Sequence, residues 1–335
     1  MNKKVKFMRK LIVLLLMIPQ SLLAADVVPE QVLVTGSFSR VSPAQMPSFV
    51  TVIDEQAIRA LDKRKVTDVL KTVPGVLVEE QGGPGGLTAV SIRGGESNFT
   101  LVLIDGVQVN DPLNSRGGSF DFGKLYINSV ERIEIVRGPQ SAIYGSDALA
   151  GVINIITRAP TEQAQQRLTA QWGEKDYETY HASASGKLAA LGYSLQVGHR
   201  DAGEPIAGST NKSDQFAIAL ALPLGEQHDV NLRYNYLDGQ SSSYPEQSGG
   251  PDYALLDALD NTQYNDRTLA LAWQYRIVDY WQSRVAVSWL QLKEDFVSPG
   301  IVPFSEVPPY DSDSDYQRTQ WQWVNTIGAG GDYWM

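Results

Sequence analysis

The chain has 335 residues with 28 Lys and Arg, 38 Asp and Glu and no Cys, so disulfide scaffolds, thiol nucleophiles and thiolate metal sites are excluded. A hydrophobic content of 43% allows a sizeable buried core, and the net charge of -10 argues against a nucleic-acid partner, because phosphate binding needs clustered basic residues. Beyond residue 25 no stretch offers the roughly 20 continuous apolar residues of a membrane-spanning helix.

The first 25 residues have the pattern of an export signal. A basic region from Met1 to Lys10 precedes an apolar run from Leu11 to Ile18, and Ala24 and Ala25 provide a small-residue cleavage site. A retained membrane anchor is the alternative, but the apolar run is too short to cross a bilayer. We therefore predict that residues 1–25 are a signal peptide.

Residues 45–158 mix helical and strand patterns and predict a small α+β domain. Asp54 is expected to cap a helix that runs to Leu61, and Thr67 to cap a second helix that ends before Pro74. Pro139 suits the first position of a short helix, with Gly145 at its end.

Strands are expected on both sides of that short helix. Asn98–Asn110 reads as two strands around a tight turn at Asp105–Gly106, and Val130–Val136 and Val152–Thr157 read as two more. Arg93, Arg132 and Arg137 are expected to form buried ion pairs, within the domain or with the barrel, with acids such as Glu131 and Glu134.

After residue 159, apolar side chains alternate with polar ones, as at Leu168, Ala170 and Trp172. Residues 160–335 give eight such strands of roughly ten residues, the length that a tilted strand needs to cross a bilayer. The predicted connections are alternately short (near 188–191, 223–227 and 277–280) and long (near 200–214, 238–266 and 293–315). This pattern predicts an antiparallel transmembrane β-barrel; a soluble sandwich is the alternative.

Three segments carry a family resemblance. They are Asp68–Val76, the pair Ser91–Gly94 and Leu101–Val107, and Val130–Thr157. In this order they resemble the plug domain of TonB-dependent outer-membrane receptors, most closely the vitamin B12 (cobalamin) transporter branch. The resemblance implies an α+β plug inside a barrel of about 22 strands in the outer membrane of a Gram-negative bacterium.

The resemblance also implies partners. Residues 26–44 would hold a TonB box and a tether, and the box would add as a strand to the periplasmic domain of TonB. Its residues would be Glu30, Gln31, Val32, Leu33, Val34 and Thr35. An ordinary edge strand of the plug is the alternative. Outer-membrane lipid would surround the barrel.

The family layout places ligand contacts in plug loops 81–89 and 110–120. The candidates are Leu87, Asn110, Asp111, Asn114, Ser115 and Arg116. Leu87 and Ser115 match cobalamin-contacting positions of that branch, but Ala89, Glu96 and Asn114 depart from its pattern. The ligand is therefore open between cobalamin and a ferric siderophore, and a merely solvated loop is the alternative.

No resident cofactor or metal is expected. The alternating carboxylates of Asp311–Asp315 nevertheless suggest a calcium site, because Ca²⁺ is bound by several oxygen ligands. Neither G-x-S-x-G, H-E-x-x-H nor a P-loop occurs in the sequence, so we do not expect an enzyme.

Eight strands cannot enclose the plug, so a fragment, a truncated product or a split receptor is expected. Two other functions stay open: a passive binding or adhesion barrel, and a non-transporting soluble plug fragment.

Overall fold

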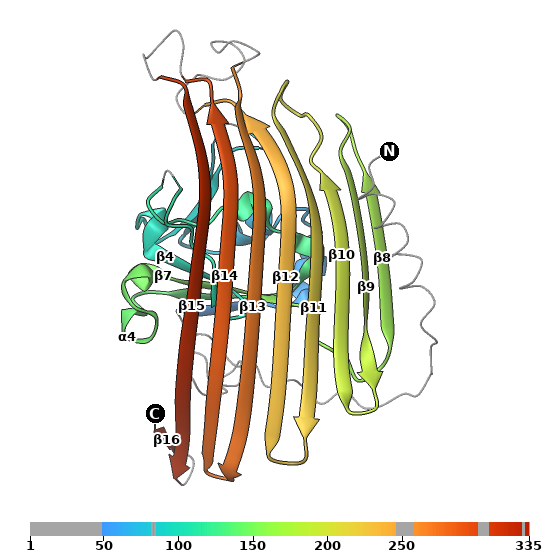
Figure 1. Ribbon diagram of the computed structural model, residues 1–335, viewed down its shortest axis with the longest axis vertical. Helices are drawn as coiled ribbons and strands as arrows, with labels where there is room; N and C mark the ends of the chain where they lie inside the picture. Colours follow the sequence, from blue (N-terminus) through green and yellow to red (C-terminus); the bar gives the residue numbers. More distant parts are fainter. Residues whose placement is uncertain are drawn as a thin grey trace.

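The computed structural model describes residues 49–81, 83, 85–114, 116–245, 258–300, 308–329 and 332–334. An N-terminal α+β domain lies against one face of a long, curved, antiparallel sheet, here called the wall (Figure 1). The predicted signal peptide and the predicted TonB box lie outside the described residues.

The N-terminal domain contains a five-stranded sheet in the order β1-β6-β7-β4-β5 and a separate β2–β3 pair. Within the larger sheet, only β4 and β7 run parallel to each other. The elements are β1 (Val50–Ile53), α2 (Glu55–Leu61), α3 (Val66–Leu70), β2 (Val76–Glu80), β3 (Thr88–Ile92), η2 (Ser97–Phe99), β4 (Thr100–Ile104), β5 (Val107–Gln108), η3 (Phe122–Lys124), η4 (Ile127–Ser129), β6 (Val130–Arg137), α4 (Ser141–Tyr144), η5 (Ser146–Ala148) and β7 (Gly151–Thr157).

The wall is a meander in which each strand pairs with its neighbour in sequence. Its strands are β8 (Gln165–Trp172), β9 (Glu178–Leu188), β10 (Leu191–Asp201), β11 (Thr210–Leu224), β12 (His228–Ser243), β13 (Asp260–Val278), β14 (Trp281–Ser298), β15 (Tyr310–Ala329) and β16 (Asp332–Trp334). Short turns follow β9, β11 and β13, and longer connections follow β10, β12 and β14, so the predicted alternation is confirmed. We call the end of the wall with the longer connections its long-loop end.

Several sequence predictions hold at the level of single residues. Asp54 caps α2 by accepting a hydrogen bond from the Ala57 backbone N at 2.8 Å. Asp105 and Gly106 have φ values of 53° and 82°, the left-handed conformation that a two-residue hairpin turn requires. Gly145 ends α4 with a φ of 84°.

Two predicted helix starts were wrong. Lys65, rather than Thr67, precedes α3, and Thr67 is buried inside the helix. Pro139 stands two residues before α4, because the backbone N atoms of Gly138 and Gln140 donate to Ala150 and Ala148 and hold this segment outside the helix.

The predicted strand lengths were also wrong for most of the wall. β11 has 15 residues and β15 has 20, and the predicted long connections shrink to 202–209, 244–259 and 299–309. The strands continue past their apolar midsections because cross-strand backbone pairing needs no apolar side chain. Asp311–Asp315, predicted in a loop, therefore lies on β15 and pairs with β14.

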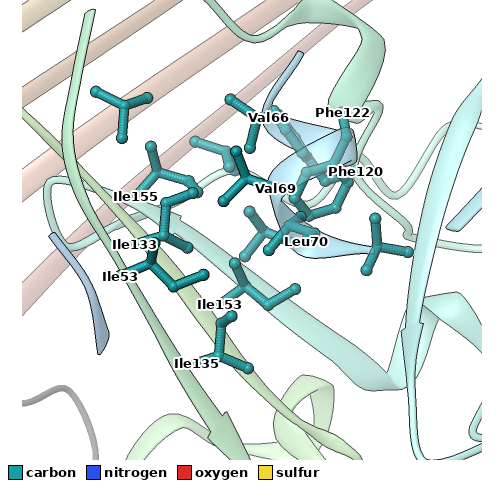
Figure 2. Close-up of a cluster of buried hydrophobic side chains, with 14 of the residues drawn as sticks. Ile53, Val66, Val69, Leu70, Phe120, Phe122, Ile133, Ile135, Ile153 and Ile155 are labelled. Carbon is teal, nitrogen blue, oxygen red and sulfur yellow. The ribbon is translucent and has the colours of Figure 1, made fainter. Parts of the chain in front are cut away.

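The main hydrophobic core joins the two parts of the chain. Figure 2 shows side chains from α3, β6, β7 and the segment around Phe120 and Phe122 packed together. Leu290 and Leu292 of the wall strand β14 belong to the same buried cluster. The N-terminal domain is thus packed directly onto the wall rather than tethered beside it.

Candidate functional site: the apical loops and their anchorage to the wall

Two loops of the N-terminal domain lie toward the long-loop end of the wall. The first apical loop, residues 81–87, joins β2 to β3, and the second, residues 109–121, joins β5 to η3. A Cβ atom added to Gly85 would lie 2.1 Å from the Ser242 carbonyl oxygen and 2.4 Å from that of Thr210. Only glycine fits this approach, which holds the first loop against β11 and β12.

Leu87, a predicted ligand residue, closes the first apical loop. Its carbonyl oxygen accepts a hydrogen bond from the Gln81 backbone N at 3.1 Å, and its side chain is half-buried. The structure therefore leaves part of Leu87 accessible at the loop base.

The second apical loop is shaped by its own polar side chains. Asp111 accepts a hydrogen bond from the Leu113 backbone N at 2.9 Å, and its own backbone N donates to Ser119. Asn114 donates to the Ser119 carbonyl oxygen at 2.6 Å and accepts from the Arg116 backbone N at 3.0 Å. These bonds give the loop a defined conformation and leave Leu113 at its exposed tip.

Asn110 lies beneath the loop rather than on its surface. Its side chain is 3% exposed, accepts a hydrogen bond from the Val102 N and donates to the carbonyl oxygens of Thr100 and Gly118. The sequence suggested a ligand contact here, whereas the geometry shows an amide that fixes the loop base to β4.

Arg116 links the two apical loops. With the Gln81 amide oxygen turned toward the guanidinium group, that oxygen accepts a hydrogen bond from Arg116 Nε at 2.8 Å. Ser115 lies outside the described residues. Asp111, Asn114 and Arg116 thus share one loop, and Arg116 connects it to the loop that carries Leu87.

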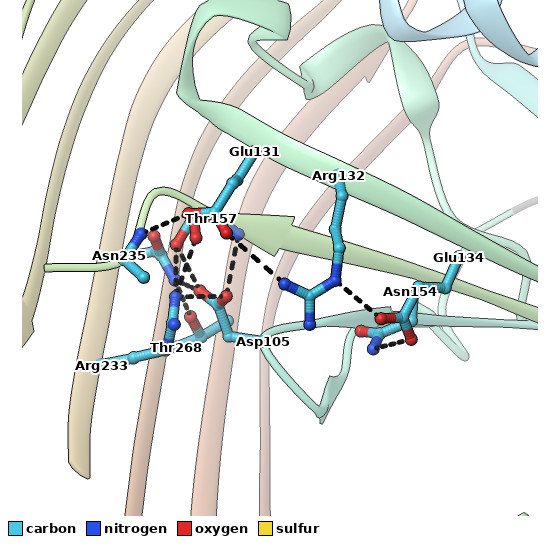
Figure 3. Close-up of polar contacts among 10 residues, drawn as sticks. Asp105, Glu131, Arg132, Glu134, Asn154, Thr157, Arg233, Asn235 and Thr268 are labelled. Carbon is cyan, nitrogen blue, oxygen red and sulfur yellow. Dashed lines mark hydrogen bonds and ion pairs between the residues drawn. The ribbon is translucent and has the colours of Figure 1, made fainter. Parts of the chain in front are cut away.

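A buried polar cluster fixes the β4–β5 turn to the wall (Figure 3). The Asp105 carboxylate is almost fully buried and lies 2.9 Å from Arg233 Nη1 of β12. It also accepts hydrogen bonds from the backbone N and hydroxyl of Thr157 and from Asn235. A buried ion pair with its remaining oxygens satisfied keeps its geometry, so the turn has a fixed place on the wall.

A second cluster in Figure 3 confirms the predicted pairing of Arg132. Its guanidinium group lies 2.9 Å from the fully buried Glu134 and 3.4 Å from Glu131. Glu131 in turn accepts a hydrogen bond from the Ala159 backbone N, where the chain leaves the domain for the wall.

Glu55, at the start of α2, binds three guanidinium groups. Arg59 and Arg158 contact its carboxylate, and Arg167 of β8 does so at 2.6 Å. Burial opposes the negative charge, but the hydrogen bonds from the three arginines outweigh burial and lower the pKa of Glu55 to about 2. Glu55 therefore joins the first helix, the linker and the first wall strand.

The sequence did not reveal the wall residues that hold the domain. Arg233 and Arg167 are charged side chains on the strand face that packs against the domain, and each stands at an alternating position of a strand. That alternation was visible in the sequence, but which partner each residue meets depends on how the domain is seated.

No three His, Asp or Glu side chains of the described residues are arranged to hold a metal ion. Asp311, Asp313 and Asp315 project from the same face of β15, where Asp315 pairs with Lys293. Calcium at this position stays an untested expectation.

Comparison with known proteins gives the arrangement its family. Residues 42–152 match the family model described as TonB-dependent receptor plug domain. This segment is a TonB-dependent receptor plug domain. We refer to the N-terminal domain as the plug from here on, and the strong resemblance seen in the sequence is confirmed.

Solved receptor structures share the plug and wall arrangement. The outer membrane receptor for alcaligin, FauA, from Bordetella pertussis matches with a TM-score of 0.66 and 18% identity over 89% of this chain and 47% of its own. The siderophore receptor PirA from Acinetobacter baumannii matches with a TM-score of 0.63 and 21% identity, over 84% and 45%. The copper transporter OprC matches with a TM-score of 0.66 and 16% identity, over 85% and 44%.

At these identities the likeness establishes the fold, and the chain spans less than half the length of each of these proteins. The predicted outer-membrane location agrees with the match to an outer membrane receptor. None of the described helices is long and apolar enough to span a membrane. The cobalamin branch finds no specific support among these matches and stays a prediction.

Proposed function

We propose that this chain supplies the plug and the adjoining wall of a TonB-dependent receptor that imports a large metal chelate across the outer membrane. One observation carries the proposal: a plug domain is seated on one face of an antiparallel wall, with two shaped polar loops at its long-loop end. The role is binding and transport rather than catalysis.

The ligand class follows from the apical loops and from the relatives. A large chelate needs several placed polar groups on a preformed surface, and Asp111, Asn114 and Arg116 offer carboxylate, amide and guanidinium groups on one internally bonded loop. The match to the siderophore receptor PirA favours a ferric siderophore. Cobalamin stays open because Leu87 and Ser115 match its branch.

Arg116 is the sharpest test of the ligand site. Losing a hydrogen bond from a charged group costs about 1.5–3 kcal/mol, which is roughly ten- to a hundredfold in affinity. Arg116→Ala should weaken binding on that scale at unchanged abundance in the membrane, and Arg116→Lys should recover only part of it, because lysine lacks the planar fork. Titration of cobalamin and of a panel of ferric siderophores measures this. Equal affinity of Arg116→Ala and the parent for the tightest ligand would remove Arg116 from the site.

The energy for transport would come from TonB, which would bind the TonB box at Glu30–Thr35. Proline at position 33 fixes φ and removes a backbone donor, so strand addition to TonB should fail. Leu33→Pro should therefore abolish uptake and leave ligand binding unchanged, whereas Leu33→Val should retain both. Uptake by Leu33→Pro at the parental rate would favour a passive binding barrel instead. Recovery of the chain only in the soluble fraction would favour a soluble plug fragment.

A further inference from the structure

Lys124 is a nearly buried lysine of the plug that meets two acidic residues of the wall. Its side chain is 12% exposed, and Nζ lies 3.4 Å from a carboxylate oxygen of Asp266 on β13 and 3.4 Å from one of Glu294 on β14. The Tyr264 ring covers the ammonium group, with its centroid 4.5 Å away. One plug cation is thus held by two neighbouring wall strands.

The surroundings of Lys124 carry more negative than positive charge. Asp121 is half-buried and interacts electrostatically with Lys124, as does Asp111 in the second apical loop. Burial opposes the charge of the ammonium group, but Asp266, Glu294 and Asp121 outweigh it and raise the pKa of Lys124 above its usual value. Lys124 therefore stays charged and offsets the mutual repulsion of the carboxylates around it.

This cluster lies at the roots of both apical loops. Lys124 ends η3, directly after the second loop. The Asp121 carboxylate accepts hydrogen bonds from the Gly123 backbone N at 2.8 Å and from that of Thr88 at 3.0 Å, and Thr88 directly follows the first loop. The two loops are thus bonded to the segment that carries Lys124.

The other end of the second loop is also bound to the wall. Gln108, 7% exposed, accepts a hydrogen bond from Gln320 at 2.7 Å through its side chain and one from Arg318 through its backbone. Both flanks of the second loop are therefore attached to the wall. Gln108 is held to β15 by hydrogen bonds to its neutral oxygens, and Lys124 is held to β13 and β14 by ion pairs.

We propose that Lys124 is a positioning residue that clamps the apical loops to β13 and β14. Only the ligand-binding role of these loops rests on the proposed function. The attachment of the loops to the wall does not depend on that role. Since Asp266 and Glu294 lie on neighbouring strands that are paired to each other, the clamp sets the apical loops at a fixed place relative to β13 and β14.

The attachment is testable without a ligand. The chain has no Cys, so Leu113→Cys, at the exposed loop tip, accepts a single nitroxide spin label. In the receptor in outer-membrane vesicles, Lys124→Met should increase the mobility of this label, because Asp266, Glu294, Asp121 and Asp111 then lose the ammonium group with which all four interact. Lys187→Met is the matched control, since Lys187 meets a single exposed acid, Glu162, and should leave the spectrum unchanged.

A rescue separates charge from packing. Adding Asp266→Asn and Glu294→Gln to Lys124→Met removes the wall charges and should return the label toward the parental mobility. The double variant Asp266→Asn/Glu294→Gln with Lys124 intact should instead mobilise the label, and it gives an answer even where Lys124→Met fails to accumulate. An unchanged spectrum in that double variant, or no recovery in the triple variant, would overturn the clamp.

The ligand readout comes second. Lys124→Met should weaken binding of the tightest ferric siderophore or of cobalamin by about tenfold or more, and the triple variant should recover it. Mobility changes as expected with no binding by any variant, the parent included, would refute the proposed function and leave the clamp intact.

Discussion

Single carboxylates at the plug–wall boundary determine how firmly the plug is held. Glu55 accepts hydrogen bonds from three arginines that come from α2, the linker and β8. Since the pKa of Glu55 is lowered to about 2 from an ordinary 4.5, its contribution to stability is complete above about pH 4.5. That contribution is lost as the pH falls from 4.5 toward 2, because protonation removes the charge that the arginines share.

We predict that Glu55→Gln loosens α2 at neutral pH. The amide keeps the shape of the side chain but leaves three neighbouring guanidinium groups without a countercharge. A loss of about 1–3 kcal/mol should speed hydrogen exchange of the α2 backbone by roughly five- to a hundredfold in the receptor. Glu79→Gln, at an exposed position on β2, is the control and should leave that exchange unchanged. Identical hydrogen exchange in Glu55→Gln and the parent would show that the negative charge of Glu55 does not stabilise α2.

At the scale of elements, the first apical loop depends on its backbone approach to β11 and β12. Gly85 leaves no room for a Cβ, because the nearest atoms would be the backbone carbonyl oxygens of Ser242 and Thr210. Gly85→Ala should therefore push the loop away from the wall and weaken ligand binding, with an increase in the rate at which protease cuts residues 81–87. Gly225→Ala, at the turn between β11 and β12, has open space for a Cβ, but its φ of 73° strains alanine. It therefore controls for a strained glycine substitution away from the apical loops and should leave binding at the parental level. If Gly85→Ala binds ligand and is cleaved as the parent is, then β11 and β12 move enough to make room for the added Cβ atom.

Local elements could be predicted from the sequence, whereas long-range roles could not. The Asp105–Gly106 turn and the Asp54 cap depend on residues a few positions apart, so their signals are contained in the sequence. The ends of the wall strands could not be predicted, because the polar residues there pair through backbone hydrogen bonds. Those bonds do not depend on the side chains and so leave no pattern in the sequence. Asn110 looked like a surface amide of a polar loop, and only the folded β4–β5 hairpin places its amide against Thr100 and Val102.

In the whole molecule, the two faces of the wall have opposite environments. One face packs on the plug (Figure 1). The other face exposes large apolar side chains at alternating strand positions, such as Leu168, Leu271, Trp273, Trp321 and Trp323. Leu232 belongs to the same face, because it pairs with Leu220 and Leu271 on the neighbouring strands. Asn231, one residue earlier, points to the opposite face. This division is what an outer-membrane location requires, with lipid on the apolar face.

Leu232→Arg and Asn231→Arg form a matched pair that tests this orientation. An arginine on the lipid side of a barrel strand costs about 2–4 kcal/mol near the middle of the bilayer, whereas a position on the inner side carries no such penalty. Leu232→Arg should thus reduce the amount of receptor assembled in the outer membrane and lower its unfolding midpoint in urea. Asn231→Arg should leave the assembled amount unchanged and alter the free energy of unfolding by no more than about 1 kcal/mol. Cell fractionation and urea titration in lipid vesicles measure both quantities. Equal loss in the two variants would point to a general intolerance of charge in β12, and a larger loss for Asn231→Arg would reverse the assignment of the two faces.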